Sequence, residues 1–212
     1  AWLLGKGDYD MTTPLPDQLH AEKMARIKAA RDRMMAGKTA EKGLLIVHTG
    51  KGKGKSSSAF GMVMRCMGHG MRVGIVQFIK GAWETGEAKF LQRFPELVEI
   101  KTMGEGFTWE TQDRARDIAA AERGWAEARR MLADPGYDFV LLDELNVALR
   151  YELVALDPVL EALAGRPPMQ HAVITGRNAP EPLIDLADLV TEMTLVKHPF
   201  RGGVKAQRGV EF

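Results

Sequence analysis

The residues with the clearest chemistry form one short run rich in glycine and lysine, Thr49-Gly50-Lys51-Gly52-Lys53-Gly54-Lys55-Ser56-Ser57. An apolar stretch, 44–47, comes before this run and a helical pattern follows it, which is the strand, turn and helix context of a phosphate-binding loop. Glycines let the backbone curl so that several amide N–H groups face one anion, and the helix adds its positive N-terminal end. We expect Lys55 to reach phosphate oxygens and the Ser56 hydroxyl to ligate Mg²⁺.

One position departs from the usual pattern G-x-x-x-x-G-K-[ST]. Thr49 stands where the first glycine belongs, and Gly50 follows one place later. The physical requirements are nevertheless met: a strand before the turn, Gly54-Lys55-Ser56 within it and a helix after it. The competing interpretation is a surface turn that merely contains lysine and glycine. The strand and helix on either side favour a site for the triphosphate of a nucleotide.

Charged side chains also follow two later strands. Asp143-Glu144 directly follows the apolar run 139–142. A carboxylate at the end of such a strand can bind the Mg²⁺, or Mn²⁺, held at a phosphate loop. The alternative is that the two acids are merely solvated residues at a strand end. The presence of the phosphate loop makes this alternative less favoured. The predicted metal ligands are therefore Ser56, Glu144 and Asp143. Thr175-Gly176-Arg177 follows the next strand, where Arg177 either covers phosphates or has a structural role.

Other common chemistries lack their sequence signatures. The histidines at 48, 69, 171 and 198 do not have metal-ligand spacing, so we expect no zinc site. The chain shows no Ser-His-Asp set, no nucleophile elbow and no G-x-G-x-x-G with a following acidic residue. The residues by themselves predict binding of a nucleotide triphosphate with a divalent cation, and they leave the reaction open.

Strand and helix patterns alternate through the chain after residue 43, which predicts a mainly parallel sheet flanked by helices. The fold class expected is α/β, a single P-loop domain of RecA-like build. Ligands of such sheets bind at the carboxyl ends of the strands. Strands are expected at 44–48, 73–78, 97–101, 137–143, 172–175 and 189–196, and helices at 57–67, 111–132, 182–187 and after a cap at Asp157-Pro158.

The N-terminal part differs from this pattern. Residues 1–17 have neither period nor caps and are interpreted as an extension. Residues 18–42 comprise a helix to about Ala36, with a weak apolar face among many basic residues, and a polar linker. We expect this helix to pack on a distant surface or on a second subunit. The nucleotide-binding domain is then 43–212.

Composition is that of an ordinary globular protein, with 212 residues, 45% hydrophobic and 27% charged. The net charge of +1 gives no reason to expect a nucleic-acid or membrane partner. No apolar stretch of spanning length and no secretory signal pattern is present. The single cysteine, Cys66, has no internal partner and suits a reducing cytosol, so a cytoplasmic location is expected.

Six separate blocks of the sequence, in order, resemble the BtuR/CobO type of ATP:corrinoid adenosyltransferase. The likeness runs from about 18 to 212, and that family also has threonine where the phosphate loop begins. Asparagine is usual at the position of Lys51 and threonine at that of Ser56, and both differences are mild. The blocks are 49–56, 73–81, 106–111, 142–145, 174–177 and the tail segments 196–198 and 203–207.

The resemblance implies transfer of the 5′-deoxyadenosyl group of ATP to cobalt(I) of a corrinoid, with release of tripolyphosphate. Reduced cobalt is itself the nucleophile, so no protein base is needed. Carbon 5′ is attacked, which implies ATP held in the reverse orientation to ordinary phosphate-loop enzymes. The implied partners are cob(I)alamin, cobinamide or a cobyrinic acid derivative, a flavin-type reductase as electron donor, and a second copy of the chain in a homodimer.

Phe107 and Trp109 lie one residue apart in a glycine-flanked segment, and we expect them to face the corrinoid. Their alternative role is to anchor the helix that follows. Two rival functions remain at this stage. A kinase or ATPase of RecA-like build would cleave ATP at phosphorus. A nucleotide-gated module for single-stranded nucleic acid would need a basic groove with stacked aromatic rings, which the near-zero net charge disfavours.

Overall fold

A computed structural model describes residues 17–79, 85–103 and 113–211. The chain falls into two compact units, Ala1–Glu41 and Lys42–Phe212. In the part of the chain described, no helix is both long and apolar enough to cross a membrane.

The first unit contains one helix, α1 (Asp17–Ala36), which begins one residue before the predicted start. An ion pair between Lys28 and Asp32, one turn apart at 3.0 Å, stabilises the helix locally. Within this unit the apolar side chains Met24 and Ile27 are exposed. The helix therefore carries no core of its own.

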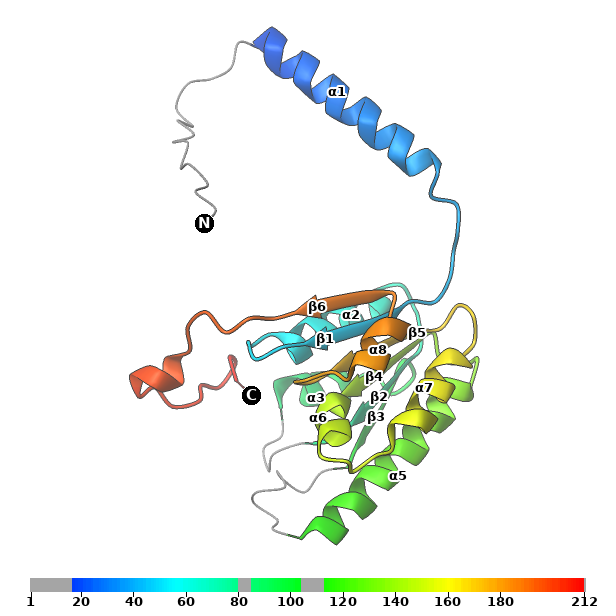
Figure 1. Cartoon of the computed structure of the whole chain (residues 1–212), viewed down its shortest axis with the longest axis vertical. Helices are drawn as coiled ribbons and strands as arrows, with labels where there is room; N and C mark the ends of the chain where they lie inside the picture. Colours follow the sequence, from blue (N-terminus) through cyan, green and yellow to red (C-terminus); the bar gives the residue numbers. More distant parts are fainter. Residues whose placement is uncertain (1–16, 80–84, 104–112, 212) are drawn as a thin grey trace. The chain divides into compact units, whose positions relative to one another are not determined.

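The second unit is built on a six-stranded sheet in the order β3-β2-β4-β5-β1-β6, which runs from the bottom to the top of the sheet in Figure 1. All neighbouring strands in the described residues pair in parallel, which confirms the predicted α/β class. The strands are β1 (Leu45–Thr49), β2 (Val73–Gln77), β3 (Val98–Thr102), β4 (Phe139–Asp143), β5 (His171–Thr175) and β6 (Leu189–Glu192). The helices are α2 (Lys55–Gly68), α3 (Gly86–Leu91), α5 (Arg114–Ala133), α6 (Leu145–Arg150), α7 (Leu156–Ala164), α8 (Glu181–Leu186) and the 3₁₀ turn η1 (Pro199–Gly202).

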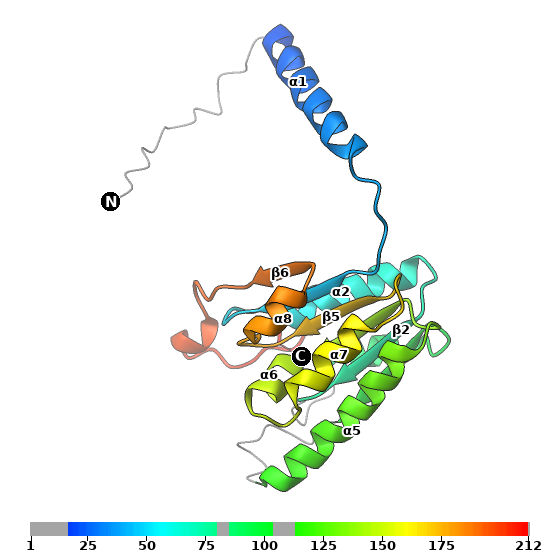
Figure 2. The same cartoon turned by 45° about the vertical axis from the view of Figure 1, so that its right-hand side comes forward.

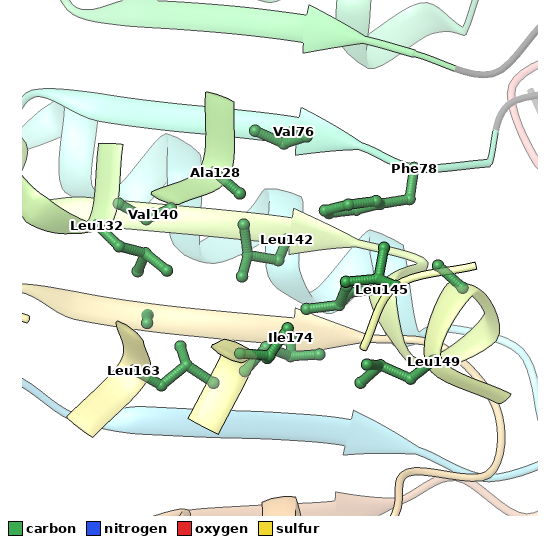
Figure 3. Close-up of a cluster of buried hydrophobic side chains, with 14 of the residues drawn as sticks. Val76, Phe78, Ala128, Leu132, Val140, Leu142, Leu145, Leu149, Leu163 and Ile174 are labelled. Carbon is green, nitrogen blue, oxygen red and sulfur yellow. The ribbon is translucent and has the colours of Figure 1, made fainter. Parts of the chain in front are cut away.

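The central strands are apolar on both faces because helices cover both faces. In β4, Val140 and Leu142 pack toward α5, α6 and α7, whereas Phe139 and Leu141 pack toward α2. Figure 3 shows the first of these cores, and α5 and α7 lie side by side over it in Figures 1 and 2. Each fully buried leucine contributes about 1.5–3 kcal/mol of stability. The resulting sheet is a rigid platform for groups at its edge.

The register of the sheet brings the strand ends to one edge. Gln77, the last residue of β2, lies level with Asp143 of β4 and with Thr102 of β3. Across the rest of the sheet, Thr175 of β5 lies level with His48 of β1. Polar residues from five strands therefore end at the same edge.

Several predicted boundaries differ from the structure by two or more residues, three of them for a clear local reason. Helix α2 begins at Lys55, two residues before the predicted start, because the phosphate loop passes directly into the helix. Strand β6 ends at Glu192 and not at 196, because the chain from Met193 turns to hydrogen-bond the phosphate loop. The cap of α7 is Ala155, which places Asp157 in the first turn, where its charge complements the helix dipole.

Helices α3 and α6 were not predicted. Each has only six residues, too few for a helical period to stand out from its surroundings. The start of α3 is fixed by Thr85, whose side chain accepts a hydrogen bond from the Ala88 amide. Helix α6 follows Asp143-Glu144 immediately, so it belongs to the geometry of the site.

Candidate active site

Thr49 ends β1 and holds the phosphate loop to two other segments. Its hydroxyl accepts a hydrogen bond from the Ala179 amide, at 3.1 Å, after β5. Its carbonyl accepts one from the Met193 amide, at 2.9 Å, after β6. The threonine that replaces the usual first glycine therefore connects the loop to both neighbouring strand ends.

The glycines of the loop permit close packing against the chain that follows β6. A Cβ atom on Gly50 would lie 2.5 Å from the Met193 carbonyl oxygen, and one on Gly52 would lie 2.5 Å from that of Thr194. The Gly52 amide donates a hydrogen bond to the Met193 carbonyl at 2.6 Å. The shape of the loop is thus set partly by β6 and its continuation.

Lys55 is the first residue of α2, and its side chain turns back into the loop. It is 6% exposed, and its ammonium group donates to the Gly52 carbonyl at 2.5 Å. Burial lowers the pKa of Lys55, while the negative charge of Glu144 acts in the opposite direction. The buried ring of His48 donates from Nδ1 to the Lys55 carbonyl at 3.2 Å, which fixes the start of the helix.

The remaining loop residues lie nearer the solvent. Lys51, Lys53 and Ser57 are exposed, and Ser56 is half-buried in the first turn of α2. Lys53 forms an ion pair with Glu211 in the C-terminal segment. The loop therefore presents two lysines at its surface and one in its interior.

A single hydroxyl group joins the two acidic residues at the end of β4. Thr175 donates to Asp143 Oδ1 at 2.7 Å and accepts from the Glu144 amide at 2.9 Å. Asp143 is 5% exposed, so its carboxylate is held inside the protein. The two acids thus have different environments: Asp143 is hydrogen-bonded in the interior, and Glu144 lies at the turn.

Glu144 occupies a strained and partly desolvated position. Its φ of 61° is left-handed, a conformation that costs a side-chain-bearing residue roughly 1–2 kcal/mol. Burial raises the pKa of Glu144, and the charge of Asp143 raises it further. The positive charges of Lys55 and Arg177 act against this rise. The structure therefore brings the predicted residues Lys55, Glu144 and Arg177 within electrostatic reach of one another.

The turn after β5 fits closely against Glu144. Gly176 has a φ of 125°, and a Cβ there would lie 2.9 Å from Asn146 Cβ and 3.2 Å from Glu144 Oε2. Asn146, in α6, donates from its amide to the Gly176 carbonyl at 3.3 Å. Arg177 follows and is exposed. The turn thereby sets the positions of both the Glu144 carboxylate and Arg177.

Sequence reasoning missed two residues of this edge. Gln77 is 4% exposed and donates from Nε2 to Asp143 Oδ2 at 3.3 Å. Thr102 in turn donates from its hydroxyl to Gln77 Oε1 at 3.1 Å. In the sequence, each is only a polar residue at the end of a strand. The strand order is needed to show that they lie at the same edge of the sheet as Asp143.

The donor set suits a divalent cation that shares its coordination with a substrate. No group of three or more His, Cys, Asp or Glu residues in the described part of the chain is placed to enclose a metal ion. Magnesium at nucleotide sites usually takes one or two carboxylates together with phosphates and water. Ser56, Asp143 and Glu144 fit that mode. The predicted corrinoid-facing residues, Phe107 and Trp109, lie outside the described residues.

Comparison with known proteins gives a consistent result. The family model described as ATP:corrinoid adenosyltransferase BtuR/CobO/CobP matches residues 41–212. The corrinoid adenosyltransferase of Pseudomonas aeruginosa is 59% identical, over 94% of this chain and 98% of its own. The corrinoid adenosyltransferase of a Sinorhizobium species is 57% identical over 92% of both chains. That of Escherichia coli K12 is 45% identical over 93% of this chain and all of its own.

Proposed function

Because the chain belongs to the ATP:corrinoid adenosyltransferase family BtuR/CobO/CobP, we propose that it transfers the 5′-deoxyadenosyl group of ATP to cobalt(I) of a corrinoid. The observation that carries this proposal is the family match over 41–212, which includes the phosphate loop and both acids of the site. In the reaction a cobalt–carbon bond forms at C5′ and the bond from C5′ to oxygen breaks. Cobalt(I) supplies both electrons, and tripolyphosphate leaves.

The protein's part in this reaction is to hold a highly charged leaving group. Lys55, aided by loop amides and the start of α2, neutralises phosphate oxygens, and Arg177 covers the phosphates from the turn after β5. Ser56, Glu144 and Asp143 would hold Mg²⁺ or Mn²⁺, which would supply charge stabilisation for the departing tripolyphosphate.

A direct assay distinguishes this reaction from cleavage at phosphorus. The protein is incubated with ATP, Mg²⁺ and chemically reduced corrinoid, while the visible spectrum is followed and the phosphate products are separated. We expect a light-sensitive cobalt–carbon product together with tripolyphosphate, and neither without corrinoid. Release of orthophosphate without that product would support a kinase or ATPase, which the family membership does not favour.

We also propose that Phe107 and Trp109 pack against the lower face of the corrin ring. Cobalt(II) corrinoids are hard to reduce while an axial ligand remains, and apolar rings that displace it and exclude water would favour the four-coordinate form.

The proposal for Phe107 and Trp109 predicts a difference between substrates. Trp109→Ala or Phe107→Ala should lower turnover from cobalt(II) corrinoid roughly 10-fold or more, while largely preserving turnover from cobalt(I) corrinoid. Equal losses with both substrates and a lower melting temperature would assign the rings to the fold.

Several finer points stay predictions. They are the choice among cob(I)alamin, cobinamide and a cobyrinic acid derivative, the flavin-type reductase, the homodimer and the cytoplasmic location. Competition between the corrinoids in the assay above measures which corrinoid is preferred. Sedimentation of the purified protein measures whether it forms a homodimer.

A further inference from the structure

A continuous series of side-chain hydrogen bonds crosses four strand ends at the edge of the sheet. It runs from Thr102 on β3 to Gln77 on β2, then to Asp143 on β4 and Thr175 on β5. The four residues end neighbouring strands, so the series follows the strand order β3-β2-β4-β5. It reaches the predicted metal site from the side opposite to the phosphate loop.

The order of donors and acceptors in this series is determined by Asp143, because an ionised carboxylate can only accept hydrogen bonds. Thr102 donates to Gln77 Oε1 at 3.1 Å, which leaves the Gln77 NH₂ group facing Asp143 Oδ2 at 3.3 Å. The opposite amide orientation would bring the Gln77 carbonyl against a carboxylate oxygen, with no proton between them. Asp143 therefore selects the amide orientation of Gln77, and the Thr102 hydroxyl, which can donate or accept, stabilises that orientation by donating to Oε1.

We propose that Gln77, held at Oε1 by Thr102, is a positioning residue of the metal site. Its amide holds Asp143 Oδ2 while Thr175 holds Oδ1, so the carboxylate is confined to one orientation before substrate binds. An ionised carboxylate has about four lone-pair positions, so both oxygens keep acceptor capacity for a cation or for its bound water. This inference rests on the proposed placement of Mg²⁺ or Mn²⁺ beside Asp143.

The same hydrogen bonds might be thought to do no more than join the strands. Yet β2 is already paired with β3 and β4 through five residues on each side, so the strands do not depend on these side chains. The Gln77 amide instead fixes the orientation of the Asp143 carboxylate. Groups that orient metal ligands typically change metal affinity by about 10- to 100-fold when removed.

The decisive variant is Gln77→Met, which keeps the length of the side chain and removes the amide. Gln170→Met is its matched control, because Gln170 is also buried, at 2% exposed, and its amide donates to three backbone carbonyls. Gln170 precedes β5, so it lies at the opposite, amino edge of the sheet. The readout is electron paramagnetic resonance of Mn²⁺ added to the protein with ATP, in the absence of corrinoid.

We expect Gln77→Met to weaken Mn²⁺ binding about 10-fold or more and to leave metal-free ATP binding unchanged. Gln170→Met should lower the melting temperature and leave Mn²⁺ binding as in the wild type. Unchanged Mn²⁺ binding in Gln77→Met would overturn the proposal.

A second pair of variants tests the hydrogen bond from Thr102 to Gln77, and it decides the matter if Gln77→Met does not fold. Thr102→Val removes the hydroxyl that holds Gln77 Oε1, whereas Thr102→Ser keeps it. We expect weaker Mn²⁺ binding in the valine variant and recovery in the serine variant. Equal affinity in the two variants would contradict the positioning role.

Asp143→Asn separates failure of this inference from failure of the metal site. If Asp143→Asn leaves Mn²⁺ binding unchanged, the placement of the cation at Asp143 is wrong, and the positioning role is wrong with it. If Asp143→Asn weakens binding while Gln77→Met does not, only the role of Gln77 is refuted.

Discussion

At the scale of single residues, the site holds two charges that the protein interior disfavours. Burial lowers the pKa of Lys55 and raises that of Glu144, and each charge partly offsets the cost of the other. A triphosphate beside Lys55 and a cation beside Glu144 would supply the missing counter-charges. The ligand-free site is therefore less stable than it would be with neutral side chains, and binding relieves that cost.

Glu144→Gln should stabilise the ligand-free protein at neutral pH and weaken its use of metal. The folded protein holds the Glu144 proton more tightly than the unfolded chain, whose glutamate has a pKa near 4.5. Wild-type stability is therefore lost as pH rises from that value through the raised pKa, and the glutamine variant escapes this loss. Melting temperatures against pH should converge toward pH 4.5 and separate above it.

The metal readout for the same Glu144→Gln variant is a Mg²⁺ titration of activity, in which we expect an apparent affinity roughly 10-fold weaker, because a neutral amide is a poor ligand for a hard cation. Corrinoid affinity should change less. An unaltered titration would transfer the ligand role to Asp143 or to water.

Lys55→Ala should lower ATP affinity by roughly 10- to 100-fold, the range of one or more charge-assisted hydrogen bonds. The fold should persist, since the variant removes a buried ammonium group and Lys55 belongs to neither apolar core. Calorimetric titration with ATP and a melting curve measure the two effects. Lys101→Ala, on β3 and ion-paired with Glu99, is the control for loss of a positive charge outside the loop. ATP affinity equal to the wild type in Lys55→Ala would refute the phosphate-loop assignment.

At the scale of elements, the turn after β5 is as important as the phosphate loop. It carries Arg177, and Gly176 leaves room for the Glu144 carboxylate and for Asn146. Both neighbours belong to the segment that follows β4, so the two turns are fitted to each other. Any added atom at Gly176 must displace one of them.

Gly176→Ala should therefore lower stability by about 1–3 kcal/mol and reduce activity further than the lost stability explains, because its φ of 125° is strained for alanine and the Cβ meets Glu144. Gly61→Ala is the matched control. Nothing lies within 4 Å of a Cβ at Gly61, in the interior of α2, and alanine there should stabilise the helix by about 0.5–1 kcal/mol. Thermal unfolding and the adenosyl-transfer assay measure both variants. Activity of Gly176→Ala close to the wild type would show that the turn tolerates rearrangement.

These elements could be predicted where the pattern that identifies them lies within one short stretch of sequence, and not where it depends on which distant strands pair. The phosphate loop and Asp143-Glu144 were identifiable because a strand, a turn and a helix are adjacent in sequence. Helix α6 was not, since six residues carry too little periodicity. Gln77 and Thr102 were not identified either, because their importance depends on β2 lying between β3 and β4, and pairing order is absent from local sequence patterns.

At the scale of the whole molecule, α1 belongs to the first compact unit and the sheet to the second, and α1 has exposed apolar side chains and a polar segment after it. We propose that it covers the active site of a neighbouring subunit, as the family resemblance also implies. Deletion of residues 1–41 should leave a folded sheet, with an apparent KM for substrate raised roughly 10-fold. Steady-state kinetics and circular dichroism of the shortened protein measure this. Unchanged kinetics would show that α1 has no role at the active site.

The strand order described above also determines when the site can form. Strand β1 pairs only with β5 and β6 among the described strands, and its β5 partners are more than half of the 212-residue chain away. Chains emerge from the ribosome N-terminus first, and such non-local pairing has a high contact order, which slows folding. During synthesis, β1 and its phosphate loop must wait for β5 and β6, which are the last of the described strands to be made. ATP, which stabilises only the assembled site, can therefore assist folding only after β6 has emerged.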